Sequence, residues 1–358
     1  MVNSLRPPTD RSLEVSERVT LTHVARAAEV SLSTASLAFS GAGPISAATR
    51  TKVLDAAAGL GYAGPNPVAR SLRRGRSGII GVVVGNDLRA RFRDPVALQT
   101  LDGLATTLAA DGLGVLLLPS EPADGGLLTH SAMDAAVLLS LSAGDAARTL
   151  RRRSIPMVRV DSRARGASSV LVQDEAGMTA LAEHLRGLGH RRVAVLTLGW
   201  RAERRHGPID LATAAPATVP YTAARMAGIR AAGIEPVAVQ QTTGSLVEEG
   251  IRAGHAVLDA SPRPTAVVAM SDLLAAGVVL AAQERGLRVP EDVSVAGFDG
   301  ADLPWLAGHE LTSVCQPIEE KGRRAAQAAI RLAAGERVRS VTLACTLRVG
   351  STTGPAPA

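Results

Sequence analysis

Two short amphipathic segments joined by a three-residue turn, within residues 19–40, constrain this 358-residue chain more than any other feature. The first segment, residues 19–28, carries apolar side chains at the spacing of a short helix. Glu29-Val30-Ser31 interrupts that stripe, and Ser31 is an N-cap candidate for a second helix over residues 32–40. Ala35 and Ala38 would point inward and allow the helices to cross closely. The pattern predicts a helix-turn-helix.

A third apolar stripe follows within the first 61 residues. It begins after Ser46, another N-cap candidate, and ends before Gly61. The sequence therefore predicts a three-helix bundle. On its own this pattern also fits a small helical domain that binds no DNA, so the segments that follow have to separate the two alternatives.

A basic segment follows the predicted bundle. Asn66 and Pro67 fit the start of a short helix, and its one large apolar residue, Leu72, lies among four arginines. So short a helix is marginal alone, and we expect it to become ordered only against a polyanion; the alternative is a basic linker. Residues 19–78 hold seven basic and two acidic side chains, so +5 of the chain's net +6 lies there. A polyanionic partner should therefore meet the N-terminal sixth of the chain.

From Gly78 onward, short apolar runs alternate with longer amphipathic segments, as in parallel sheets flanked by helices. Strands are predicted at residues 79–85, 114–119, 135–140, 156–161, 193–199, 236–241, 266–270 and 293–298. Helices are predicted at residues 96–108, 177–188, 221–232, 246–260 and 272–286. The two sets of strands predict two doubly wound lobes with a ligand cleft at the carboxyl ends of their strands.

The segments VTLTHVARAAEVSLSTASLAFSG, ISAATRTKVLDAAAGLGY and NPVARSLRRGRSGIIGVVV together resemble the lactose-repressor/galactose-repressor (LacI/GalR) family of bacterial transcription regulators. Further family-like segments are HLRGLGHRRVAVL, ARMAGIRAAGI, PTAVVAMSDLLAAGVVLAAQERGLRVPEDVSVAGFDG and LTSVCQPIEEKGRRAA. The resemblance implies an N-terminal all-α helix-turn-helix domain plus hinge helix, and a C-terminal α/β two-lobed domain like the type I periplasmic-binding proteins. It also implies a transcriptional repressor.

The implied domain boundaries are a disordered tail at residues 1–18, a DNA-binding domain at 19–65, a hinge helix and linker at 66–78, and an effector-binding domain at 79–358. Within the last, the N-lobe is expected at residues 79–173 and 311–336 and the C-lobe at 174–310 and 340–354. The resemblance places the crossings between the lobes near Gln173-Asp174, near 309–311 and within 336–340.

For DNA, the resemblance places Leu32, Ser33 and Leu37 at the major groove. It places further residues near phosphates: Thr22, Ser31, Thr34 and Ser36. In the hinge, Leu72 would wedge into the minor groove, with Asn66, Ala69 and Arg70 on the same DNA-binding segment. Many relatives carry Arg where Leu37 stands, and one bidentate Arg–guanine contact is worth roughly 1–3 kcal/mol of discrimination. Leu37 would instead meet thymine methyl groups.

For the effector, the resemblance points to Asp161, Arg225 and Asp299. Carboxylates accept and a guanidinium donates hydrogen bonds to sugar hydroxyls, although each residue also fits a cap or an ion pair between the lobes. Trp200 either stacks on a sugar ring or packs in the core, and Phe92 is a further aromatic candidate. Asp272 fits a structural helix cap. Residues 200–220 are long enough for a lid over the cleft.

The implied partners are a near-palindromic double-stranded DNA operator, a sugar effector and a second copy of the chain in a homodimer. No nucleophile, metal or phosphate-loop motif is present, so we expect no catalytic residue, no metal and no cofactor. Cys315 and Cys345 lack metal or redox spacing, and no apolar run reaches the length of a membrane span; a cytoplasmic, nucleoid-associated protein is expected. The alternative, an extracytoplasmic sugar-binding protein, does not account for residues 19–78.

Overall fold

The structure, a computed structural model, describes residues 19–40, 43–64, 75–85, 88–120, 126–139, 144–164, 166–201, 203, 205–306 and 308–357. It consists of two units, Met1–Ser77 and Gly78–Ala358, which are described separately below.

The N-terminal unit contains α1 (Leu21–Ala27), α2 (Leu32–Ser40) and α3 (Ala47–Gly59). Its core consists of small apolar side chains from all three helices, and Val24, Ala35 and Val53 in it are completely buried. Small residues at the crossing of α1 and α2 bring the helices close together. The predicted bundle is therefore present.

The first lobe of the second unit, the N-lobe, is built on a sheet in which the described strands are all parallel, in the order β12-β5-β4-β3-β1-β2. The strands are β1 (Ile79–Val83), β2 (Gly114–Leu118), β3 (Ala135–Leu139), β4 (Met157–Val160), β5 (Ser168–Val172) and β12 (Val341–Leu343). Its helices are α5 (Leu88–Arg91), α6 (Pro95–Ala110), α7 (Leu127–His130), α8 (Asp145–Arg152) and α13 (Ile318–Ala333).

The second lobe, the C-lobe, has the strand order β13-β11-β10-β9-β6-β8-β7, in which β7 and β13 run antiparallel to their neighbours. Its strands are β6 (Val193–Thr197), β7 (Gly207–Pro208), β8 (Ala238–Gln241), β9 (Ala266–Ala269), β10 (Ser294–Asp299), β11 (Thr312–Cys315) and β13 (Thr346–Arg348). Its helices are α9 (Asp174–Gly187), α10 (Pro220–Ala231), α11 (Val247–Leu258) and α12 (Asp272–Glu284).

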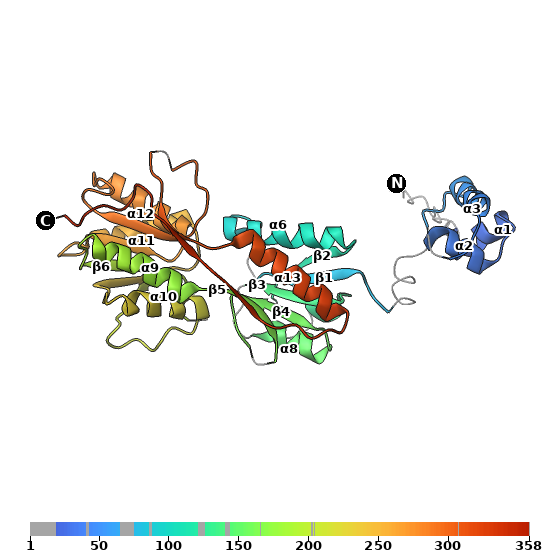
Figure 1. Cartoon of the computed structure of the whole chain (residues 1–358), viewed down its shortest axis with the longest axis horizontal. Helices are drawn as coiled ribbons and strands as arrows, with labels where there is room; N and C mark the ends of the chain where they lie inside the picture. The colour runs from blue at the N-terminus through green and yellow to red at the C-terminus, as the bar shows by residue number, and fades with distance from the viewer. Residues whose placement is uncertain are drawn as a thin grey trace, which may run out of the picture. The chain divides into compact units, whose positions relative to one another are not determined.

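Helices cover both faces of each sheet, which explains why β3, β6 and β9 are fully buried and why β3 and β9 are apolar along their whole length. In the N-lobe α6 and α13 pack on one face and α7 and α8 on the other. In the C-lobe α11 and α12 cover one face and α9 and α10 the other (Figure 1). The predicted fold class, a helix-turn-helix domain followed by a two-lobed α/β domain, is confirmed.

Two of the three crossings between the lobes differ from their predicted positions. β11 pairs in parallel with β10, so residues 312–315 belong to the C-lobe and the second crossing falls at Gln316-Pro317 instead of residues 309–311. β12 pairs with β5, so the chain stays in the N-lobe up to Leu343 and crosses at Ala344-Cys345 instead of within 336–340. Both errors arise because strands of three or four residues carry too few side chains to reveal which sheet they join.

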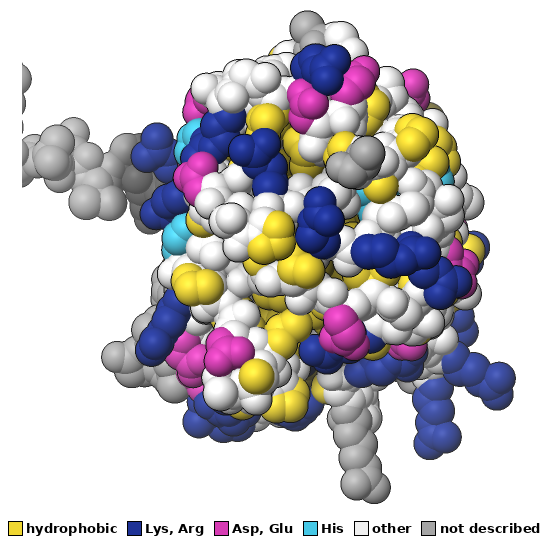
Figure 2. Space-filling model, turned by 90° about the vertical axis from the view of Figure 1, so that its left-hand side faces the viewer, with side chains coloured by type: hydrophobic (Ala, Val, Ile, Leu, Met, Phe, Trp, Pro, Cys, Tyr) yellow, Lys and Arg dark blue, Asp and Glu magenta, His cyan; other side chains and the backbone are white. Residues whose placement is uncertain are grey.

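Charged side chains of both signs are interspersed over the end of the second unit that the C-lobe forms (Figure 2). This mixed surface agrees with the near-neutral charge of the chain after residue 78. Within the described part of the chain, no helix combines the length and hydropathy needed to cross a membrane.

Candidate functional sites

Helix α2 directs its inward face at the bundle and two of the predicted DNA-contacting residues, Leu32 and Ser33, outward. Ala35 and Ala38 are buried, whereas Leu32 is 52% exposed and Ser33 is also exposed. Thr22, on α1, is exposed as well. An apolar side chain as exposed as that of Leu32, at the start of a helix, suits contact with another macromolecule.

Hydroxyl groups gather at the first turn of α2. Ser31 Oγ accepts a hydrogen bond from the backbone N–H of Thr34 at 3.0 Å, the expected N-cap, and lies 2.8 Å from the hydroxyls of Ser33 and Thr34. These hydroxyls stand at the positive end of the helix dipole, where protein groups commonly bind phosphates.

Leu37 lies further along α2 and is partly buried. Its side chain packs over Gly43, whose φ is +100°: a Cβ added to Gly43 would lie only 2.8 Å from Leu37 Cδ2. A glycine at this turn therefore provides both the left-handed backbone and the room for Leu37. The predicted hinge residues Asn66, Ala69, Arg70 and Leu72 lie outside the described residues.

In the second unit, Asp161 lies directly after the carboxyl end of β4, with a positive φ of 59°. Its carboxylate receives a bidentate ion pair from Lys321 Nζ, at 3.2 and 3.1 Å. Lys321 is 1% exposed and donates a third bond, of 2.7 Å, to Gln316 Oε1. An ammonium has three protons, so these bonds account for all of its donors.

Gln316 carries this network across to the C-lobe. Its Nε2 donates to Asp299 Oδ1 at 2.7 Å, and Asp299 is the last residue of β10. The buried chain Asp161–Lys321–Gln316–Asp299 thus joins the predicted effector carboxylates of the two lobes. Burial raises the pKa of Asp299 well above its usual range, although Arg225 opposes the shift.

Arg225 belongs to a second buried cluster beside Asp299. Its Nε donates to Asp174 Oδ1 at 2.8 Å, its Nη1 donates to the carbonyl of Met270 at 2.5 Å, and its guanidinium lies 3.5 Å from the ring centroid of Phe298. Burial alone would lower the pKa of Arg225, but the surrounding carboxylates, Asp174 foremost, outweigh burial and raise it. Arg225 therefore stays a fixed cation.

A cavity of about 900 Å³ opens beside these two clusters. It is lined by Asp161 and its neighbours, by the start of α9 with Asp174, and by the first turns of α10 with Tyr221. The carboxylates of Asp161 and Asp174 bond Lys321 and Arg225 inside the protein, and both residues also line this cavity.

The N-cap of α12 is Ser271, whose hydroxyl accepts from the Leu274 N–H at 3.2 Å, and not Asp272, for which the sequence predicts a helix cap. Asp272 is structural in another way. It is completely buried; its two oxygens accept bonds from the Ser313 hydroxyl at 2.6 Å and from the Ala301 backbone N–H at 2.7 Å. Burial raises its pKa to about 6. Asp272 therefore holds the segment after β10 against β11, which fixes the position of Asp299.

The two predicted aromatic residues have different surroundings. Trp200 is only 5% exposed, lies in a hydrophobic cluster and donates its indole N–H to the Ala215 carbonyl at 2.8 Å, which favours the packing alternative. Phe92 is 52% exposed and precedes Arg93, whose guanidinium pairs with Glu248 of the C-lobe at 2.6 Å. Part of the predicted lid, Gly207–Pro208, is strand β7 at the edge of the C-lobe sheet.

Three residues of this site, Lys321, Gln316 and Asp174, were not among the predicted effector residues. Lys321 has a signal in the sequence: it lies on the inward face of α13 with Ile318 and Ala325, where the stripe is otherwise apolar. A cation at such a position needs a buried partner. Among the described residues, no group of His, Cys, Asp and Glu could hold a metal ion, and both cysteines are free thiols.

Comparison with known proteins gives the family. Residues 20–66 match the model "Bacterial regulatory proteins, lacI family" and residues 182–353 match "Periplasmic binding protein-like domain". The chain is 35% identical over 334 residues to an HTH-type transcriptional regulator of Mycolicibacterium smegmatis, covering 88% of this chain and 91% of the relative. The chain belongs to the LacI family. It is a DNA-binding transcriptional regulator.

Two solved structures of LacI-family regulators resemble the whole chain. The lac repressor dimer bound to operator and the anti-inducer ONPF has a TM-score of 0.75 and 25% identity, covering 94% of this chain and 100% of that one. The complex of the regulator CelR with cellobiose has a TM-score of 0.65 and 28% identity, with the same coverage.

Proposed function

We propose that this LacI-family regulator is a repressor that binds a near-palindromic operator as a homodimer and releases or retains it according to a sugar bound between its lobes. A protein that acts on chromosomal operators works in the bacterial cytoplasm, at the nucleoid. The observation that carries the proposal is the chain Asp161–Lys321–Gln316–Asp299, which joins carboxylates of both lobes in one hydrogen-bonded network.

The network supplies a mechanism for control. A sugar in the cavity beside it offers hydroxyl groups that compete for Asp161, which lines that cavity, and so for the bonds that Lys321 makes to Asp161. Lys321 also bonds Gln316, which occupies the crossing between the lobes and bonds the buried Asp299, so a change at Asp161 alters how the lobes are held. The coupling is reciprocal: a ligand that weakens operator binding binds the DNA-bound protein more weakly.

The size and chemistry of the cavity support a sugar. Small-molecule sites commonly measure about 300–1,000 Å³, and the cavity of about 900 Å³ accommodates a mono- or disaccharide. Its lining combines carboxylates with the aromatic ring of Tyr221. The neighbour CelR is bound to cellobiose, so cellobiose is the first disaccharide to test.

The test selects operators from random duplex DNA with the full-length protein and then titrates the enriched duplex with monosaccharides and disaccharides, cellobiose included. We expect a sequence with two-fold symmetry and a steep fall in affinity with added salt, since phosphate contacts release counterions. A sugar that changes operator affinity should raise the melting temperature of the protein.

Asp299→Ala should abolish that thermal shift and leave operator binding nearly intact. Enrichment of no sequence would refute operator recognition, and an unchanged shift in Asp299→Ala would remove Asp299 from the site. If operator binding is specific but no sugar alters it, the proposed effector class is wrong.

A further inference from the structure

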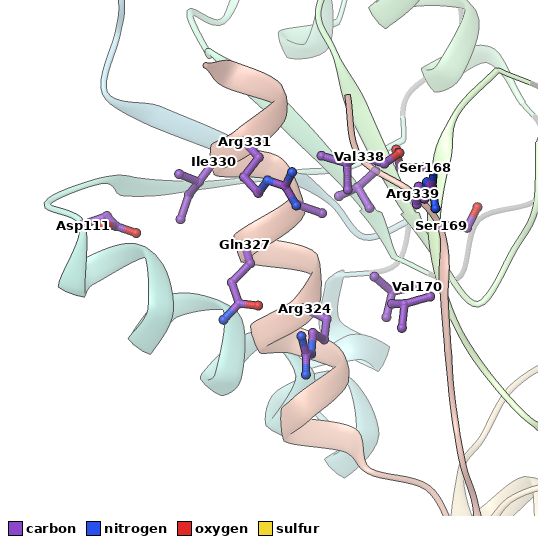
Figure 3. Close-up of a pocket in the computed structure, with 13 residues that line it drawn as sticks. Asp111, Ser168, Ser169, Val170, Arg324, Gln327, Ile330, Arg331, Val338 and Arg339 are labelled. Carbon is purple, nitrogen blue, oxygen red and sulfur yellow. The ribbon is translucent and has the colours of Figure 1, made fainter. Parts of the chain in front are cut away.

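A second pocket, of about 340 Å³, lies in the N-lobe between α13 and the sheet edge formed by β5 and β12 (Figure 3). It shares no lining residue with the cavity beside Asp161. Ser168 and Val158, which line it, pair near the amino ends of β5 and β4, whereas Asp161 follows the carboxyl end of β4. The pocket is therefore at the other end of the sheet from the sugar cleft.

Positive side chains surround this pocket. Arg324 and Arg331 extend from α13, and Arg339 lies across the pocket with Ser168 and Ser169 (Figure 3). Asp111 is the one carboxylate among the lining residues. The lining thus carries three guanidinium groups and one carboxylate. Glu320 and Glu336, outside the pocket, offset the charge of Arg324 and Arg331, but N–H donors still outnumber acceptors around the pocket, which suits an oxyanion.

The arginines from α13 are held in place by neighbours outside the pocket. Arg324 Nε donates to Glu320 at 2.6 Å, and Arg331 Nε donates to Glu336 at 2.7 Å. A guanidinium has five N–H donors in a fixed fork, so an ion pair through Nε orients the group while its Nη donors are available for a second oxyanion.

The floor of the pocket is apolar. Val158, Val170 and Ala328 are buried beneath it, and the partly exposed side chains of Ile330, Val338 and Val341 form its apolar surface. A bare inorganic ion would contact only the arginines at the rim. A ligand that also carries a hydrocarbon or ring face would gain the burial of that face on the valines.

We propose that this pocket is a second ligand site of the regulator, which binds a small organic oxyanion: a carboxylate or phosphate ester whose charged group lies between Arg331 and Arg339 and whose apolar face lies on Val338 and Val341. The site is separate from the sugar cleft and goes beyond the proposed function.

The experiment measures binding of benzoate, citrate and glucose 6-phosphate to the full-length protein by calorimetry and thermal shift, with inorganic phosphate and glucose as references. At least one organic anion should bind saturably and more tightly than inorganic phosphate, and the identity of the tightest probe separates carboxylates from phosphate esters. Arg331→Gln combined with Arg339→Gln should abolish this binding. Gln327→Glu, an isosteric change in the lining, should raise the Kd about tenfold through charge repulsion.

Matched controls come from arginines of the same region that do not line the pocket. Arg323→Gln and Arg337→Gln remove the same charge from the protein and should leave the Kd unchanged. Asp299→Ala should not affect binding either, which separates this site from the sugar cleft. Failure of every organic anion to bind, equal weakening by the control variants, or unchanged binding in Arg331→Gln/Arg339→Gln would each overturn the proposal.

Discussion

Lys321 is the residue on which the polar network of the second unit depends. Its position is fixed by the close packing of α13 against α6: a Cβ on the adjacent Gly322 would collide with the backbone of Thr100. This packing fixes the backbone at Lys321, and the bonds to Asp161 and Gln316 hold its ammonium. A buried charge pair of this kind adds little net stability, yet loss of one partner is costly because the other is left uncompensated.

Replacing Lys321 by Met should lower the free energy of unfolding by about 3–5 kcal/mol, the usual effect of breaking a buried pair. The double variant Lys321→Met/Asp161→Asn should recover a large part of that loss, since it leaves no uncompensated charge. Urea denaturation of wild type, both single variants and the double variant measures the coupling. Additive losses would show that the pair is not coupled in the folded protein.

The same double variant separates stability from ligand control. It keeps Gln316 and Asp299 but removes the link from Gln316 to Asp161. The effector should bind more weakly, because Asp161 is one of its proposed contacts. If the network transmits the effect of the sugar, a saturating amount of effector should also change operator affinity less than in the wild type.

Among the elements, α2 offers a test of the DNA-binding surface that is independent of its side-chain contacts to bases. Ser31→Ala removes the N-cap of α2, and Ser46→Ala removes the equivalent cap of α3, where Ser46 Oγ accepts from Thr49 N at 3.1 Å. Each change should destabilise the N-terminal unit by about 1 kcal/mol. Only Ser31→Ala should also weaken operator binding of the folded protein, since α3 is not the predicted reading helix. Fluorescence anisotropy measures the operator affinity of each variant at a temperature where both are folded. Equal affinities of the two variants would argue against α2 as the DNA-reading helix.

Long, regular elements were predictable because they repeat their pattern over many residues. The segments that became β1, β3 and β6 are apolar runs, and α6 and α12 have clear helical stripes. β5, β11, β12 and β13 were missed. They are at most five residues long and mix serine, threonine and arginine with apolar side chains, so their pairing is decided by the neighbouring backbone and not by their composition.

The residues of the candidate site are likewise only partly predictable from the sequence. The family resemblance points to Asp161, Arg225 and Asp299. It does not give their hydrogen-bond partners, because Lys321 is 160 residues from Asp161 in the sequence and no local rule joins them. Only the structure shows that Asp161 lines the cavity, that Arg225 and Asp299 are buried beside it, and that Lys321 and Gln316 join Asp161 to Asp299.

At the scale of the whole molecule, the proposed homodimer requires a surface through which two copies of the chain associate. Among the described strands, β2 lies at an edge of the N-lobe sheet, beside α6 (Figure 1). Val115 on β2 is 39% exposed and Leu98 on α6 is 43% exposed. An unpaired edge strand with apolar side chains is unusual in a monomer and suits association with a second copy. We expect the dimer contact to include this edge.

Val115→Glu should then convert the protein to a monomer, because it places a charge in the contact, while Val237→Glu, a change at a 52% exposed valine of the C-lobe, should not. Light scattering after size-exclusion chromatography measures the mass of each variant. A monomer holds only one half-site at a time, so the operator affinity of Val115→Glu should fall by about tenfold or more, whereas each half-site contact stays intact. Sugar binding should persist, since the cleft lies within one chain. If Val115→Glu is still a dimer with wild-type operator affinity, the two copies associate through another surface.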